Sequence, residues 1–155
     1  MIEKVKKGLL REINRELERV YGVKLPKDLE YFRRKEKIYG IKKEKLKEIF
    51  EIEGLKIDNI GIRLLNIERD GIRLTIEGAQ LIGRDAKRNV LKINKDIAEI
   101  FLAGEDVEIE EAFDYPYVIV RYKNDILGVG RIIKGNILRP YIPKERRIPK
   151  KYIKN

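Results

Sequence analysis

Three short apolar stretches in the last third of the chain constrain its fold most. Residues 117–122, 126–133 and 137–142 are rich in β-branched and aromatic side chains, which favour strands. The segments Lys123-Asn124-Asp125 and Gly135-Asn136 separate them with residue types that favour turns. Three strands at such close and regular spacing predict a small β-barrel.

The N-terminal part of the chain predicts helices mixed with strands. Apolar residues recur every three or four positions from Ile2 to Val20, which predicts an amphipathic helix over residues 2–21 that ends at Gly22. An extended segment over residues 31–41 and a short helix over residues 42–50 are expected to follow.

The middle of the chain carries local signals for a hairpin and two capped helices. Asp70-Gly71 has the residue types of a tight turn between strands at 60–68 and 72–75. Thr75 and Asn94 are expected to cap helices that end near Gly83 and Ala103, with a strand at 89–93 between them. Together these elements predict an α+β protein, with an N-terminal α/β domain over residues 1–94 and a small β-barrel domain over residues 95–155.

The residue types that are missing limit the chemistry of the chain. It contains no Cys, His or Ser, so thiolate chemistry, imidazole general-base catalysis and zinc sites with nitrogen or sulfur ligands are excluded. The spacings Gly78 to Gly83 and Gly130 to Gly135 resemble a phosphate-binding loop, but neither precedes the Lys-Ser/Thr pair of such loops. We read the acidic residues 105–111 as a solvated strand edge rather than a metal site. We therefore expect a non-catalytic protein without a cofactor or a metal.

Composition also bears on where the protein works. The chain has no apolar run of about 18 residues that would predict a membrane span, and its charged first residues do not resemble a secretory signal. The absence of cysteine favours a cytoplasmic protein. The abundance of Lys, Glu, Arg and Ile is typical of thermophile proteins.

Positive charge is concentrated at the C-terminal end. Residues 131–155 hold nine basic side chains and one acidic, whereas residues 51–130 hold 11 basic and 16 acidic ones. Basic side chains neutralise phosphates and aromatic rings stack on bases, so this end predicts a polyanion-binding surface. A tail that only increases solubility is the alternative. The candidate residues are Arg131, Lys134, Arg139, Tyr141, Lys144, Arg146, Arg147, Lys150, Lys151 and Tyr152.

Two further features have both a functional and a purely structural interpretation. Arg33, Arg34, Lys35 and Lys37 form a second basic patch, which is either a binding surface or a solvated strand edge. The sequence Gly128-Val-Gly130 lies inside a predicted strand. It indicates either a bulge or a close approach of the backbone to a ligand, and both can hold together.

Several of these motifs together resemble a PUA domain, the RNA-binding module named for pseudouridine synthases and archaeosine transglycosylases. They are Phe101-Leu-Ala-Gly-Glu-Asp-Val-Glu108, Tyr117-Val-Ile-Val-Arg-Tyr122 and Ile126-Leu-Gly-Val-Gly-Arg131. The segment from Asn136 to Arg147 resembles the end of the PUA-like module of Sun/Fmu-type RNA cytosine methyltransferases. The methyltransferases' catalytic cysteines and cofactor-binding portion have no counterpart here.

Further motifs lie upstream: Lys37-Ile-Tyr39, Gly61-Ile-Arg63, the hairpin to Arg73-Leu-Thr75, the helix at 77–83 and the strand at 89–93. Their order resembles that of small ribosome-biogenesis factors, which pair an α/β domain with a C-terminal PUA domain. The resemblance implies an RNA-binding protein for structured rRNA or tRNA, in ribosome biogenesis or as an accessory to an RNA-modifying enzyme. A protein–protein adaptor that docks on an assembly factor or RNA methyltransferase is the alternative. Phosphates would contact Arg131, Lys134, Arg139, Lys144, Arg146 and Arg147, with Gly128 and Gly130 allowing backbone approach and Tyr141 stacking on a base.

Overall fold

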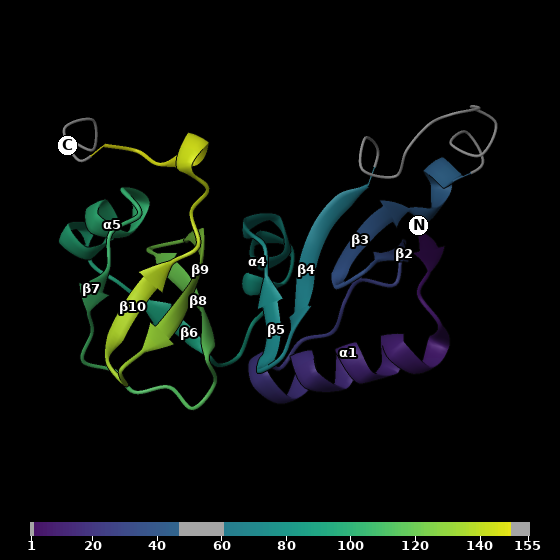
Figure 1. Ribbon diagram of the computed structural model, residues 1–155, viewed down its shortest axis with the longest axis horizontal. Coiled ribbons are helices and arrows are strands. Elements are labelled where there is room, and N and C mark those ends of the chain that lie inside the picture. The colour runs from purple at the N-terminus through teal and green to yellow at the C-terminus, as the bar shows by residue number, and fades with distance from the viewer. Residues whose placement is uncertain (1, 47–60, 150–155) are drawn as a thin grey trace.

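A computed structural model describes residues 2–46 and 61–149, and shows two sheets side by side (Figure 1). The first sheet is antiparallel throughout and has the order β1-β2-β3-β4-β5. Its strands are β1 (Glu3–Lys4), β2 (Leu29–Arg34), β3 (Lys37–Lys42), β4 (Ile62–Glu68) and β5 (Gly71–Leu74). An α/β domain in the strict sense has parallel strands, so the N-terminal half is better described as α+β, and the prediction of an α/β domain is corrected.

The helix α1 (Lys7–Tyr21) begins later than its apolar pattern predicts. Glu3 and Lys4 instead pair with β2, and the buried Val5 donates its backbone N–H to the Tyr31 carbonyl at 2.9 Å. Pairing across the chain therefore overrides the helical spacing of the first residues. The predicted end of the helix is confirmed, because Gly22 adopts φ 77° and donates its N–H to Glu18.

The segment that was expected to be extended over residues 31–41 is a hairpin. It turns at Lys35, whose φ is 54°, so that β2 and β3 pair side by side. The positive φ of a lysine gives no compositional signal for a turn. The helix predicted over residues 42–50 begins as the 3₁₀ turn η1 (Lys43–Lys45), and residues 47–50 lie outside the described part of the chain.

The hairpin at Asp70-Gly71 and both capped helices are confirmed. β4 and β5 meet at this turn, with Glu68 opposite Gly71. The Thr75 hydroxyl accepts the Gly78 N–H at the start of α4 (Ile76–Gly83), and the Asn94 side chain accepts the Ile97 N–H at the start of α5 (Lys95–Leu102). α4 lies between the two sheets and packs against β4 and β9 (Figure 1).

The second sheet has the order β6-β8-β9-β10-β7. Its strands are β6 (Val90–Lys92), β7 (Val107–Glu108), β8 (Tyr117–Tyr122), β9 (Asp125–Ile133) and β10 (Ile137–Pro140), and the 3₁₀ turn η2 (Lys144–Arg146) follows them. The three predicted strands are confirmed, and they form a curled sheet compatible with a small barrel. β6 precedes residue 94 yet pairs in parallel with β8, so strand pairing assigns it to the second half.

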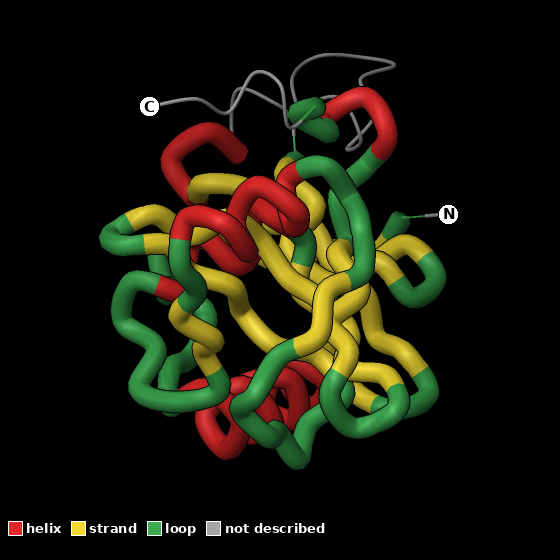
Figure 2. Tube along the Cα trace, turned by 90° about the vertical axis from the view of Figure 1, so that its left-hand side faces the viewer, coloured by secondary structure: helices red, strands yellow, loops and turns green. Residues whose placement is uncertain are grey.

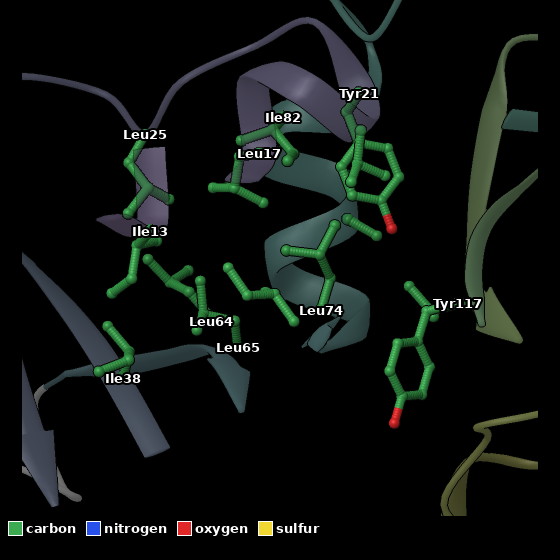
Figure 3. Close-up of a cluster of buried hydrophobic side chains, with 14 of the residues drawn as sticks. Ile13, Leu17, Tyr21, Leu25, Ile38, Leu64, Leu65, Leu74, Ile82 and Tyr117 are labelled. Atoms are coloured by element: carbon green, nitrogen blue, oxygen red, sulfur yellow. The ribbon is translucent and has the colours of Figure 1, made fainter. Parts of the chain in front are cut away.

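The first half of the protein, which carries the first sheet, and the second half, which carries the second sheet, share a hydrophobic core. Leu17 and Tyr21 of α1 and Leu74 of β5 pack in one cluster with Ile119 and Val129 of the second sheet. Tyr117 reaches into this cluster from the second half (Figure 3). A separate cluster around Phe101, Val118 and Leu138 fills the second half itself.

A view turned by 90° from Figure 1 shows helical segments on opposite sides of the strands (Figure 2). No helix within residues 2–46 and 61–149 is long and apolar enough to cross a membrane.

Candidate nucleic-acid interface

Three of the predicted phosphate-binding arginines form ion pairs with carboxylates from earlier in the chain. Arg131 contacts Asp70 at 2.6 Å, Arg139 contacts Asp106 at 2.9 Å and Arg146 contacts Glu77 at 2.9 Å. Side-chain exposure in these three pairs lies between 35% and 57%, so solvent still reaches them. A phosphate can contact any of these guanidinium groups only in competition with its carboxylate.

Arg131 belongs to a network that joins the two halves. It donates to the Tyr117 hydroxyl at 2.8 Å, and that hydroxyl donates to Asp70 at 2.7 Å. The hydrogen bond from Tyr117 and the contact with Arg131 hold the pKa of Asp70 below its ordinary value. Because Tyr117 of β8 and Arg131 of β9 both donate to Asp70 in the β4–β5 turn, Arg131 serves the junction between the halves.

The remaining predicted cations are more accessible. Lys134 and Lys144 are exposed, and within the described residues no ion pair involves either of them. Arg147 is exposed and donates its Nε–H to the Ile142 carbonyl at 3.0 Å, which leaves its positive charge without a carboxylate partner among the same residues. Lys150, Lys151 and Tyr152 lie outside the described residues.

Both glycines of the Gly-Val-Gly sequence are buried and take part in packing. Gly128 has φ 145° and sits beside a break in the β8–β9 register, between Val120 and Arg121. A methyl group at Gly130 would lie 2.3 Å from the Leu138 side chain. These contacts support the interpretation as a strand bulge, and the proposed approach of a ligand to this backbone stays a prediction.

Tyr141 is half-buried, and the Arg73 guanidinium lies 4.5 Å from the centre of its ring. Tyr117 lies 6.1 Å away from the same ring, at a tilt of 51°. The ring face beneath Arg73 is therefore occupied by a cation and is closed to a stacking base.

A pocket of about 270 Å³ opens between the β4–β5 hairpin, the start of α4 and the segment after β10. We call it the junction pocket, and its charged and aromatic lining consists of Arg63, Arg73, Glu77, Tyr141, Arg146 and Arg147. It brings together three of the predicted site residues, namely Tyr141, Arg146 and Arg147. Arg131, Lys134, Arg139 and Lys144 are not in its lining.

Sequence reasoning missed Arg63 and Arg73. The hairpin that carries them was predicted, but their position beside the C-terminal segment depends on how the two halves pack. A second cationic group was also missed, in a pocket of about 360 Å³ beside β6 that Lys87, Arg88, Lys92 and Arg121 line with Glu111. Arg88 is fixed there by hydrogen bonds to the Arg19 and Glu18 carbonyls at the end of α1.

The second predicted basic patch lies on the β2–β3 hairpin. Arg33 donates to the Lys35 carbonyl at 2.7 Å across the turn, and Lys35 is exposed. Arg34 is the last residue of β2, and Lys37 is the first residue of β3. Lys37 lies in register with Asn66 of β4, which in turn lies in register with Arg73 of β5. Lys37 therefore belongs to a row of residues that leads across the sheet towards the junction pocket.

The acidic run after α5 lies along an edge of the second sheet. β7 is the edge strand, Asp106 pairs with Arg139, and Glu108 accepts a hydrogen bond from Asn136 at 3.0 Å. No group of three acidic side chains in the described ranges is placed to hold a metal ion. The position of β7 at the end of the strand order agrees with the interpretation of this run as a strand edge.

The comparisons with known proteins concern mainly the second half of the chain. Residues 88–148 match the family described as the PUA domain of the methyltransferase RsmF. A ribosomal RNA small subunit methyltransferase F from Aeromonas salmonicida is 33% identical over 96 residues, which is 61% of this chain and 20% of that protein. The protein of the same name from Vibrio cholerae is 25% identical over 134 residues, which is 86% of this chain and 28% of the relative.

The chain therefore spans between 20% and 28% of the length of these curated relatives. The matches confirm the resemblance to a PUA domain that the motifs of residues 101–147 indicate. The C-terminal part of the chain carries a PUA domain similar to the C-terminal module of Sun/Fmu-type RNA methyltransferases.

Proposed function

We propose that this protein binds structured RNA, with ribosomal RNA as the first candidate, and that it does so without catalysis. The match of residues 88–148 to a PUA domain carries the proposal. Ribosomal RNA is favoured over tRNA because the matched relatives are named as ribosomal RNA methyltransferases. The cations around the junction pocket support it, because phosphates supply most of the affinity of proteins for nucleic acids.

The same resemblance suggests a cellular role for the protein. We propose that the protein acts in ribosome biogenesis or as an accessory to an RNA-modifying enzyme. Recognition would depend on the shape and backbone of the RNA, because A-form duplexes are read mainly in that way. The resemblance of the first half to small ribosome-biogenesis factors stays a prediction.

A titration of RNA against salt tests the proposal. The protein is titrated with a labelled stem-loop RNA at several salt concentrations, and is compared with a variant in which Arg139, Arg146 and Arg147 are all Ala. Each lost contact to a duplex phosphate should reduce the slope of log affinity against log salt by about 0.9, or about 0.7 for a single strand. The triple variant should therefore lose roughly two to three units of slope if all three side chains contact phosphates.

A control variant of equal charge separates specific contacts from net charge. Arg11, Arg15 and Arg84 are exposed and lie outside the predicted site, so their joint replacement by Ala should affect the slope less. Equal slopes for the two variants would contradict the assignment of phosphate contacts to the C-terminal arginines. No binding of the unaltered protein to structured RNA would contradict the proposed function itself.

The proposed lack of catalysis is supported by the absence of Cys, His and Ser. Its test is incubation of the pure protein with total RNA and a radiolabelled methyl donor. We expect no transfer above background, and transfer above background would overturn this part of the proposal.

The surface gives less support to the alternative of a protein adaptor. In the described part of the chain, the exposed large apolar side chains are Ile62, Leu81 and Ile148, which belong to three different segments. Docking surfaces for proteins usually have contiguous apolar patches. RNA therefore remains the proposed ligand.

A further inference from the structure

We propose that the junction pocket binds one phosphodiester group of the RNA backbone, through arginines from both halves of the protein. This inference rests on the proposed function, because it names the group of the RNA that the site takes. Arg63 of β4 and Arg73 of β5 would contribute together with Arg146 and Arg147 of the C-terminal segment. The first sheet would thereby be part of the RNA interface, although the family match begins at residue 88.

The charge of the lining favours an anion. Four guanidinium groups and one carboxylate, that of Glu77, line the junction pocket. Arg63 is exposed, and none of the ion pairs among the described residues involves it. Its backbone is held in place, because its carbonyl accepts the Thr75 hydroxyl at 2.7 Å. The pocket therefore has an accessible cation on a fixed strand.

The geometry of Arg73 favours a phosphate over a base. Its Nε and Nη2 atoms donate to Glu68 at 3.2 and 3.1 Å, so a phosphate must compete with that carboxylate for them, and its guanidinium lies over the ring of Tyr141. The aromatic face that a base would use is thus occupied by the cation. An arginine whose orientation is fixed in advance loses less conformational entropy when it binds an anion. The volume of the pocket, about 270 Å³, falls just below the usual range of small-molecule sites, which agrees with a ligand as small as one phosphate group.

The start of α4 adds to the positive potential and also supplies a competitor. The N-terminal end of a helix carries a partial positive charge, and the first turn of α4 forms one wall of the junction pocket. Glu77 lies in that turn and contacts Arg146 at 2.9 Å. A bound phosphate must compete with this carboxylate for Arg146. Removal of the Glu77 charge should therefore strengthen RNA binding.

A path for the adjoining phosphates follows from the strand register. Lys37, Asn66 and Arg73 are direct neighbours across β3, β4 and β5. Adjacent strands lie about 4.8 Å apart, so the backbone of Lys37 is roughly 10 Å from that of Arg73. A strand of RNA anchored in the junction pocket would then pass towards the β2–β3 hairpin, which carries the second predicted basic patch.

The test uses the full-length chain and a fluorescein-labelled RNA stem-loop with a 3′ single-stranded overhang. Arg63→Ala should weaken binding roughly tenfold or more, as expected for one charge-assisted hydrogen bond. It should also reduce the salt slope by about 0.7 to 0.9. Arg69→Ala is the matched control, because Arg69 is an exposed arginine of the same hairpin outside the junction pocket. Its effect should be at most about twofold, as for a distant charge screened by salt.

A second variant tests the sign of the effect. Glu77→Gln should strengthen binding about twofold to fivefold, because it removes the one carboxylate of the lining. The matched control is Glu12→Gln, which makes the same change in net charge at an exposed position of α1. A melting temperature close to that of the unaltered protein would show that each variant folds.

The outcomes separate this inference from the proposed function. Binding by the unaltered protein, with Arg63→Ala no weaker than Arg69→Ala or Glu77→Gln no stronger than Glu12→Gln, overturns the phosphate site and leaves RNA binding intact. Failure of the unaltered protein to bind any structured RNA overturns the proposed function first, and the phosphate site with it.

Discussion

Replacing Tyr115 by Phe should loosen the contact between the two halves of the protein. Tyr115 is buried, and its hydroxyl accepts the backbone N–H of Ile72 at 2.6 Å. The same hydroxyl donates to Glu16 of α1 at 3.1 Å. The variant keeps the ring and its edge contacts with Tyr21 and Tyr117. It removes only the oxygen atom that joins the loop before β8 to the first half.

The expected loss in the free energy of unfolding follows from the backbone N–H that the substitution leaves without a partner. The Ile72 N–H would lose its partner in a buried position, and a buried donor without a partner costs about 1–3 kcal/mol. The hydrogen bond to Glu16 is only part-buried and adds less. We expect a loss of about 2 kcal/mol in the free energy of unfolding, and a melting temperature lower by about 4–8 °C for a protein of this size.

Tyr21 offers a matched control in the same cluster. It is fully buried, but its hydroxyl makes no hydrogen bond with any described residue. Tyr21→Phe should therefore leave the stability unchanged or increase it, because it removes an unpaired polar atom from the core.

Thermal unfolding followed by circular dichroism and urea titration would measure both variants. If Tyr115→Phe lost no more stability than Tyr21→Phe, the hydroxyl of Tyr115 would not connect the halves. RNA affinity of Tyr115→Phe should stay close to normal at temperatures well below its transition, since Tyr115 lies outside the junction pocket.

Three further perturbations test other parts of the structure. Gly130→Ala places a methyl group 2.3 Å from the Leu138 side chain and should cost about 1–3 kcal/mol in urea unfolding; a weaker RNA affinity at unchanged stability would instead favour a ligand at this backbone. Thr75→Ala removes the cap of α4 and should cost about 1–2 kcal/mol, and a thermal transition equal to that of the unaltered protein would refute the role of the cap. The pKa of Asp70 is lowered by Tyr117 and Arg131, so its contribution to stability is present above pH about 4 and is lost as the pH falls further. Asp70→Asn should flatten this acid part of the stability curve, and a curve of unchanged shape would contradict it.

Local signals in the sequence predicted the elements that depend on neighbouring residues. The Thr75 and Asn94 caps each bond a backbone N–H three residues ahead, so nothing outside the helix is needed to form them. The hairpin at Asp70-Gly71 and the end of α1 at Gly22 likewise depend on single residue types that favour a turn or a cap. These features were all found where they were expected.

Features that depend on distant contacts could not be predicted in the same way. The first residues join β2 because Glu3 meets Arg33, a partner far along the chain. β6 pairs in parallel with β8, and the apolar periodicity of α5, which lies between them in the sequence, does not predict this pairing. The position of Arg63 and Arg73 beside the C-terminal segment is of the same kind, because it depends on the packing of one half against the other.

Charge shows most clearly what a count of residues leaves out. The C-terminal segment is strongly basic and the middle of the chain is acidic. In the folded protein, some basic side chains of the C-terminal segment form ion pairs with acidic side chains of the middle part. Arg131, Arg139 and Arg146 each meet a carboxylate from that acidic middle part. Exposed ion pairs of this kind contribute little to stability, at most about 1 kcal/mol each. They do lower the local potential, so the sites best able to attract phosphate are those where cations outnumber carboxylates. By this criterion the junction pocket is a candidate, because its four arginines meet two carboxylates among the described residues, Glu68 beside Arg73 and Glu77 beside Arg146.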